Sequence, residues 1–117
     1  SFLRGKPVPH GTAVALVLPG VMLHNAPAVA EKYYYAAGVA GIDLGGVSRE
    51  EGIRRVAAWI DDLRRRHTPY GCLADADLTE ADLPAMMEIG LSVRRLLDPN
   101  PVDVSEVDAE RIYRAVL

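Results

Sequence analysis

The apolar residues show the clearest helical spacing in the segment 48–67. Five of them recur at i, i+3, i+4, i+7 and i+10 and so form one stripe: Ile53, Val56, Ala57, Ile60 and Leu63. Ser48 and Glu51 have the S-x-x-E spacing of a capping box, in which two side chains satisfy backbone N–H groups at a helix start. The pattern predicts an amphipathic helix that begins directly after Ser48.

A nearly continuous apolar run lies between His10 and His24 and lacks the alternation of a half-buried strand. Its length predicts a buried helix. Pro19 predicts a bend in that helix, because proline has no N–H and crowds the preceding turn. Pro27 stands where a second helix begins, and the glycines in segment 38–41 are typical of its end.

The second half of the chain alternates turn signals with shorter apolar segments. The proline, glycine and aspartates of segment 68–78 predict a loop, and Thr79 then resembles the cap of a fourth helix through Leu91. The prolines of segment 98–101 end that helix, and a last helix starts near Ser105. No convincing strand is present. The sequence therefore predicts an all-α fold, a bundle of about five helices in a single helical domain spanning residues 1–117.

Composition narrows the classes of partner. Of the 117 residues, 50% are hydrophobic and 25% charged, which is typical of a globular chain. The formal net charge is −3, so we expect no nucleic-acid binding. Polar residues interrupt the apolar run before it reaches the roughly 20 residues of a membrane span, so we expect no membrane segment. Cys72 is the single cysteine, which excludes an internal disulfide and fits a cytoplasmic location.

The run Arg64-Arg65-Arg66-His67 is the most basic segment of the chain. It falls in the last turn of the predicted helix after Ser48, where cations complement the helix dipole, and Asp61 and Asp62 precede it. We interpret it as a solvated helix end and not as a nucleic-acid patch.

Three segments resemble iron-containing alcohol dehydrogenases. Residues 9–25, PHGTAVALVLPGVMLHN, match the family signature PHG-x-A-x-A-x-x-LP-x-VM-x-x-N. Residues 78–84, LTEADLP, are similar to a helix entry in the family, and Asn100-Pro101 followed by Asp108 and Ile112-Tyr113 is similar to its closing segment. The step from Asn25 to Ala28 is similar to maleylacetate reductases within the family. The resemblance runs from about Pro7 to Leu117.

This resemblance implies both a fold and a function. The chain would form part of the C-terminal helical domain of the dehydroquinate synthase-like, iron-dependent alcohol dehydrogenase fold, as the C-terminal fragment of a larger two-domain enzyme. The family holds a divalent metal with an aspartate and three histidines, and the histidine of the PHG motif is the last of them. The resemblance thus places a metal ligand at His10, with Fe²⁺, Zn²⁺ or another divalent metal and NAD(P) as cofactors of the intact enzyme. The remaining ligands and the glycine-rich nucleotide turn would lie upstream.

His24 is a competing metal candidate because it lies fourteen positions after His10, a spacing that also occurs between the family's last two ligands. The PHG context nevertheless favours His10, and His24 falls where the family usually has an aromatic residue. We therefore interpret His24 as a packing or surface residue.

The functional hypothesis is the C-terminal part of a metal-dependent, NAD(P)-linked alcohol dehydrogenase that exchanges hydride between an alcohol and an aldehyde or ketone. The fragment alone is expected to be inactive and to bind neither cofactor tightly. Its expected partners are the upstream nucleotide-binding domain and helices, together with further copies in a homo-oligomer. The alternative is a non-catalytic helical oligomerisation or interaction module with the family fold.

Overall fold

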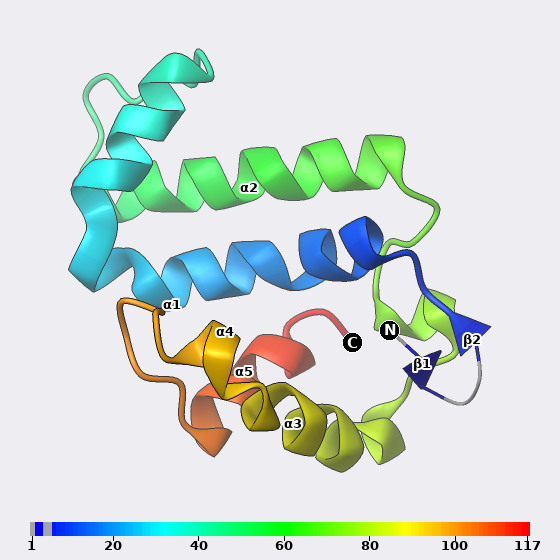
Figure 1. Ribbon diagram of the computed structural model, residues 1–117. Coiled ribbons are helices and arrows are strands. Elements are labelled where there is room, and N and C mark those ends of the chain that lie inside the picture. The colour runs from blue at the N-terminus through cyan, green and yellow to red at the C-terminus, as the bar shows by residue number, and fades with distance from the viewer. Residues whose placement is uncertain (1, 4–5) are drawn as a thin grey trace.

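The computed structural model describes residues 2–3 and 6–117 and is almost entirely helical (Figure 1). In chain order its elements are β1 (Phe2–Leu3), β2 (Lys6–Pro7), α1 (His10–Val39), α2 (Arg49–His67), the 3₁₀ turns η1 (Leu73–Ala76) and η2 (Glu80–Asp82), α3 (Leu83–Ser92), α4 (Arg94–Leu97) and α5 (Glu106–Arg114). The all-α class with about five helices is confirmed. The short antiparallel pair β1–β2, in which Phe2 lies opposite Pro7, was not predicted. Two-residue strands are too short to produce an alternating pattern.

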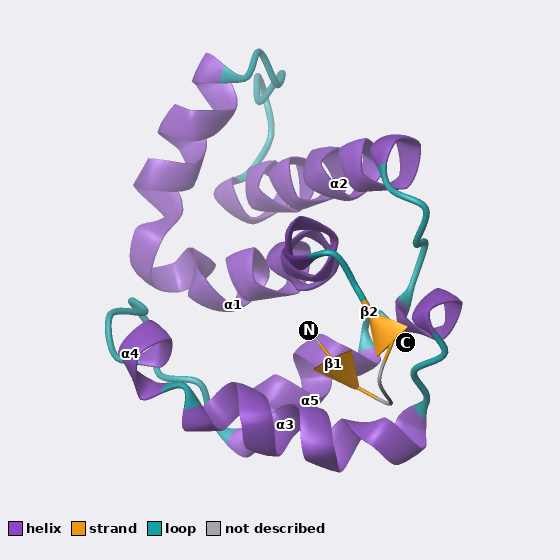
Figure 2. Ribbon diagram, turned by 45° about the vertical axis from the view of Figure 1, so that its right-hand side comes forward, coloured by secondary structure: helices purple, strands orange, loops and turns teal. Residues whose placement is uncertain are grey.

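The first two predicted helices form one long helix, α1, with a sharp change of direction (Figure 2). Pro19 keeps helical backbone angles, and the non-helical residue inside α1 is Val29, with φ −133° and ψ 23°. The break therefore follows Pro27 by two residues, and the bend predicted at Pro19 was misplaced. Each proline removes one backbone hydrogen bond, but only the second is followed by a break in the helical angles.

Helix α2 begins and packs as predicted. The Ser48 side-chain oxygen accepts a hydrogen bond of 3.2 Å from the Glu51 N–H, which caps the helix. Ile53, Val56 and Ala57 of the apolar stripe are buried. The chain reverses between Val39 and α2, so α2 runs antiparallel to the first half of α1 and lies along it (Figure 1).

Arg64 corrects the prediction of a wholly solvated helix end. Its side chain is 2% exposed, whereas that of its neighbour Arg65 is 62% exposed. The Arg64 guanidinium donates to Asp61 Oδ1 from Nε at 3.1 Å and from Nη2 at 2.5 Å. Its Nη1 donates to the carbonyls of Tyr70 at 2.7 Å and Gly71 at 2.8 Å. Through these hydrogen bonds, Arg64 holds the loop after α2 against the helix.

The segment after that loop is compact. Asp75 Oδ2 accepts from the backbone N–H groups of Gly71 and Cys72, which holds the turn η1. Asp82 Oδ2 accepts from the Thr79 N–H at 2.8 Å, so the predicted cap forms in front of α3. Val93 interrupts the fourth predicted helix and divides it into α3 and α4. These local hydrogen bonds thus hold the turns that precede α3.

Two clusters of buried apolar residues share α1. The C-terminal cluster consists of Leu16, Leu73, Leu78 and Met86. The hairpin cluster consists of Met22, Ala37 and Val56. The first joins the start of α1 to η1 and α3, and the second lies between α1 and α2. Helix α1 is therefore the element around which both parts of the fold are built.

Candidate metal ligand and apolar groove

His10 is the first residue of α1 and follows Pro9, the N-cap. Proline suits this position because a helix start has no intrahelical use for its missing N–H. The His10 side chain is exposed and makes no hydrogen bond or ion pair with the residues that the structure describes. No group of three or more His, Cys, Asp or Glu side chains in the described part of the chain is arranged to hold a metal ion. His10 can thus act as one ligand, but the described residues by themselves do not form a set of three or more protein ligands.

His24 lies in a different environment. Fourteen residues of helix place it about 21 Å along α1 from His10, so the two histidines are not brought together. Its Nε2 is 2.9 Å from the Asp103 carbonyl oxygen, and its Nδ1 is 3.1 Å from Arg111 Nη2. A carbonyl only accepts and a guanidinium only donates, so the neutral tautomer with the proton on Nε2 satisfies both contacts. With Asp108 Oδ1 3.8 Å from Nδ1, this side chain, 9% exposed, joins α1 to α5 as a packing residue.

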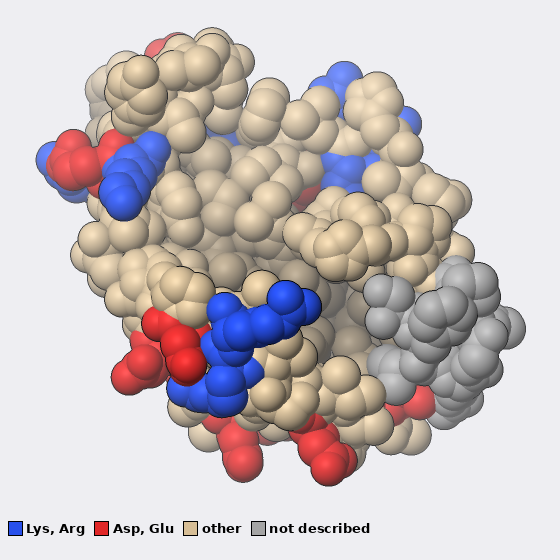
Figure 3. Space-filling model, in the orientation of Figure 1, with Lys and Arg blue, Asp and Glu red and all other residues tan. Residues whose placement is uncertain are grey.

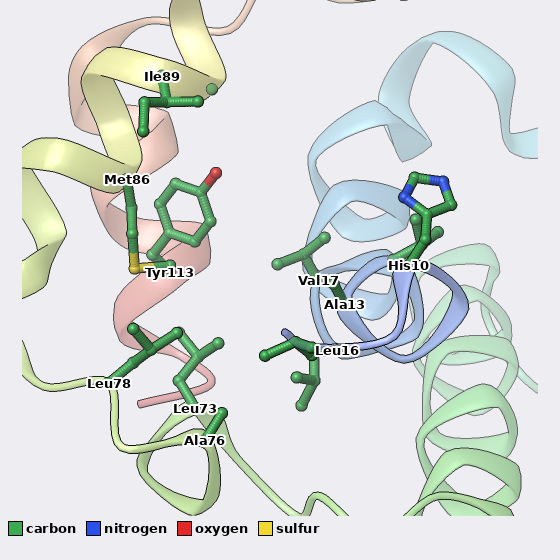
Figure 4. Close-up of a pocket in the computed structure, with 13 residues that line it drawn as sticks. His10, Ala13, Leu16, Val17, Leu73, Ala76, Leu78, Met86, Ile89 and Tyr113 are labelled. Carbon is green, nitrogen blue, oxygen red and sulfur yellow. The ribbon is translucent and has the colours of Figure 1, made fainter. Parts of the chain in front are cut away.

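A cavity of about 290 Å³ lies directly beside the start of α1. Figure 4 shows His10, Leu16 and Val17 on one wall and Met86 and Tyr113 on the other. Apolar side chains make up most of the lining: Val8, Ala13, Val14, Leu16, Val17, Leu73, Ala76, Leu78, Met86 and Ile89, with Gly90, His10 and Tyr113. The site can therefore receive an apolar group next to an imidazole.

A second cavity of about 230 Å³ shares Val17, Gly90 and Tyr113 with the first and extends past Val21 toward Leu97. The two together are called the α1–α3 groove. Figure 3 shows hollows bordered by uncharged side chains on this face, with a cluster of Lys or Arg side chains beside them near its centre. No described Lys, Arg, Asp or Glu lines either cavity, so the groove is an uncharged channel between α1 on one side and α3 with α5 on the other.

Tyr113 is the main polar group of the inner wall of the groove. Burial raises the pKa of its phenol, so the hydroxyl is neutral at physiological pH. A Cβ at Gly90 would lie 2.8 Å from the Tyr113 oxygen, so only glycine leaves this room on α3. The sequence drew attention to Tyr113 only through the closing motif, and nothing in the local pattern indicated that it faces a cavity.

Helix α1 is strongly apolar, yet most of its most apolar part is not buried. Within the described residues it is the one helix long and apolar enough to cross a membrane, with a mean hydropathy of 1.6 in its best window, of which 22% is buried. The core helix of a soluble domain passes the same test, so this is weak evidence for a span. Val14 and Leu23 remain 45% and 46% exposed. The described residues thus leave much of α1 uncovered.

Comparison with known proteins identifies the family of this chain. Residues 7–117 match the family model described as "Fe-containing alcohol dehydrogenase family, C-terminal". The chain belongs to the iron-containing alcohol dehydrogenase family. The lactaldehyde reductases of Escherichia coli strains K12 and O157:H7 are each 35% identical to it over 83 residues. A crystal structure of 1,3-propanediol oxidoreductase is 29% identical and superposes with a TM-score of 0.83.

The chain spans only part of the length of these relatives. The matched region is 71% of this chain and 22% of the length of each reductase. The solved oxidoreductase is matched over 94% of this chain and 28% of its own. The resemblance read from the PHG motif is therefore confirmed for family and fold. The role of His10 as a metal ligand stays a prediction.

Proposed function

We propose that this chain is the C-terminal part of a two-domain, metal-dependent and NAD(P)-linked alcohol dehydrogenase, with residues 1–117 as one helical domain. The observation that carries the proposal is the position of His10: an exposed imidazole at the start of α1, without a protein partner among the described residues, in a chain that matches the family over residues 7–117. The nucleotide-binding domain and the remaining metal ligands would be supplied upstream.

The donor set fits this role in part. A neutral imidazole is a good ligand for Fe²⁺ and for Zn²⁺, and His10 presents one on a rigid element. When bound, such a metal supplies a Lewis acid that polarises the oxygen of an alcohol or carbonyl during hydride transfer. In this proposal His10 holds and orients the metal, and the apolar side chains beside it, Ala13, Val14 and Val17, keep water from that side of the site.

The names of the relatives suggest the class of substrate. Lactaldehyde and 1,3-propanediol are small hydroxylated molecules, so we take short-chain hydroxyaldehydes and diols as the first candidates. A cytoplasmic location, the absence of nucleic-acid and membrane partners, and assembly into a homo-oligomer belong to the same proposal.

The decisive experiment compares His10→Ala with His24→Gln in the intact parent protein. We expect His10→Ala to lose bound metal and NAD(P)H-dependent carbonyl reduction while far-UV circular dichroism stays unchanged. His24→Gln should retain metal, because His24 packs against α5 and lies far from His10. Full metal content and activity in His10→Ala would refute the assignment.

The isolated chain provides a second test. A single imidazole gives no chelate effect, so calorimetric titration with Fe²⁺ or Zn²⁺ should show no stoichiometric site tighter than roughly micromolar, about −8 kcal/mol. Turnover of NAD(H) should not exceed that of the His10→Ala chain. Activity above that control would show that the chain completes a site by itself.

The apolar α1–α3 groove supports a second candidate function, a non-catalytic helical interaction or oligomerisation module. Activity of the intact protein separates the two. A folded, full-length protein that binds its partners but neither metal nor NAD(P) would favour the module.

A further inference from the structure

His24 joins α1 to α5 through a ring that meets charged residues from two other segments. Its Nδ1 lies 3.1 Å from Arg111 Nη2 and 3.8 Å from Asp108 Oδ1, both on α5. Its Nε2 lies 2.9 Å from the carbonyl oxygen of Asp103, in the loop before α5. Helix α1 itself places no charge nearby, because it contains no Lys, Arg, Asp or Glu before Glu31. The charge around this ring is therefore set by α5 and the loop that precedes it.

The neutral ring has one arrangement that satisfies both of its nitrogens. A carbonyl only accepts hydrogen bonds, so Nε2 carries the proton and donates it to Asp103. Nδ1 is then an acceptor and receives the Arg111 guanidinium. The same Arg111 Nη2 also donates to Asp108 Oδ1 at 3.0 Å, so the guanidinium links the carboxylate to the ring. In this state Arg111 is the bridge from α5 to His24.

A second proton on the ring is incompatible with this bridge. Protonation places an N–H on Nδ1, which then faces the N–H of a guanidinium that keeps its own protons at any physiological pH. Two cations at this distance repel strongly where little water separates them, and the His24 side chain is 9% exposed. The Arg111 side chain is 63% exposed, so solvent can receive it. The proton therefore displaces the guanidinium.

Asp108 is placed to take over the contact. Its Oδ2 accepts from the Ser105 hydroxyl at 2.7 Å and from the Ser105 N–H at 3.1 Å, which fixes the carboxyl group at the start of α5. These bonds hold the pKa of Asp108 below its ordinary value, so it is an anion over the range of about pH 5 to 8 in which histidines change their charge. The 3.8 Å from its Oδ1 to Nδ1 needs to shorten by only about 1 Å to become a hydrogen bond. The carboxylate can thus accept from the new N–H while Ser105 still holds its other oxygen.

We infer that His24 is a proton-dependent switch between α1 and α5, in which Arg111 holds the neutral ring and Asp108 holds the protonated ring. The Asp103 carbonyl keeps its hydrogen bond in both states, because Nε2 carries a proton in each. As the pH falls, α5 gains an unpaired guanidinium at its surface without losing its attachment to α1. The switch is a property of this fold and does not depend on the proposed enzymatic function.

The test observes the histidine rings by ¹⁵N NMR in the 117-residue chain, labelled at histidine and titrated between about pH 5 and 8. The variants are Asp108→Asn and Arg111→Met. Arg114→Met is the matched control, because Arg114 is also on α5 and 47% exposed but pairs with Glu80 and Glu110 instead. The exposed ring of His67, at the end of α2, is the internal reference. Helix content from circular dichroism shows that each variant folds.

Neutral His24 should have an unprotonated Nδ1 in the unmodified chain. Asp108→Asn should shift the midpoint of the His24 ring titration to lower pH and Arg111→Met should shift it to higher pH, each by a few tenths of a pH unit. Arg114→Met should leave the midpoint where it is, and the His67 titration should be the same in all four proteins. A neutral ring protonated at Nδ1, or a midpoint that neither Asp108→Asn nor Arg111→Met moves, would overturn the inference.

An effect of the two charges without an exchange of partners would also shift the midpoint, so the Arg111 guanidinium is observed directly. In arginine-labelled chain its rotation should be restrained above the midpoint and become rapid in step with the His24 titration. His24→Gln cannot take up a proton, so Arg111 in that variant should give the same signal across the whole pH range. A guanidinium that stays restrained below the midpoint in the unmodified chain would show that no exchange takes place and would refute the switch.

Discussion

Replacing Arg64 with methionine should destabilise the chain by about 3 kcal/mol. Methionine keeps an unbranched side chain of similar length but removes all four hydrogen bonds that the guanidinium makes to Asp61, Tyr70 and Gly71. Bonds to charged groups contribute about 1.5–3 kcal/mol each. The two backbone carbonyls supply most of the loss, because Asp61 is 32% exposed and water can replace part of its pairing.

Arg65→Met is the matched control. Arg65 also donates to Asp61, at 2.8 Å, but its side chain is 62% exposed, so its loss should destabilise the chain far less than the loss of Arg64. Burial raises the pKa of Asp61, yet the hydrogen bonds from Arg65 and Arg64 outweigh this and lower it overall. Stability from this carboxylate is therefore present above its unfolded pKa and is lost as the pH falls through the folded pKa. Both variants should therefore lose less stability on acidification than the unmodified chain. At neutral pH, only Arg64→Met should unfold at a much lower urea concentration.

Urea unfolding at a fixed, low protein concentration, followed by circular dichroism, measures both variants. A loss of about 3 kcal/mol corresponds to a melting temperature lower by roughly 12 °C for a chain of this size. Equal losses in Arg64→Met and Arg65→Met at neutral pH would contradict the argument, because they would show that burial and the two carbonyl contacts add nothing.

Three further outcomes follow from the same structure. Gly52→Ala should destabilise the chain by about 1–3 kcal/mol, because its Cβ would lie 2.7 Å from Tyr34 Cζ. The loss should be smaller in a Tyr34→Ala background. Thermal unfolding of the unmodified chain, the two single variants and the double variant measures this difference. Hydrogen bonds from the side chain and backbone of Ser105 lower the pKa of Asp108, so its contribution is lost as the pH falls below about 4, and Asp108→Asn should flatten this acid limb in urea titrations. The isolated chain should form dimers or larger species in light scattering at micromolar concentration, since its α1–α3 groove is uncovered, and Val14→Arg should restore the monomer; a wild-type monomer would contradict this.

Local chemistry explains which elements were predictable. The start of α2 follows from Ser48 and Glu51, and the cap before α3 follows from Thr79, because each depends on residues within one turn. The PHG motif likewise predicted the family and the helical class from a contiguous segment. Signals of this kind need no knowledge of the tertiary structure.

Arg64 shows what the charge pattern concealed. The run 64–67 was interpreted as a unit, although Arg64 follows Ile60 by four residues and so continues the apolar stripe on the buried face of α2. The helical spacing of the stripe alone would have predicted that Arg64 is buried and that Arg65 is exposed. Its partners, the carbonyls of Tyr70 and Gly71, belong to a loop whose path the sequence does not reveal.

The groove was beyond prediction for a different reason. It depends on how α1, α3 and α5 lie relative to one another, and on Tyr113 meeting Gly90 across 23 positions of sequence. Likewise, both Pro19 and Pro27 are compatible with a break in α1, and only the backbone angles of the folded chain show that the break falls at Val29.

Because α1 belongs to two clusters, different parts of the molecule should unfold locally with different free energies. The hairpin cluster joins segments that are close in sequence, α1, the reversal after it and α2. The C-terminal cluster instead ties Leu16 to residues from Leu73 onward, across a long intervening loop of chain. Releasing that cluster regains the chain entropy of the larger loop while α1 and α2 stay paired. Amide protons in α3 and α5 should therefore exchange with solvent through openings that leave those of α2 protected.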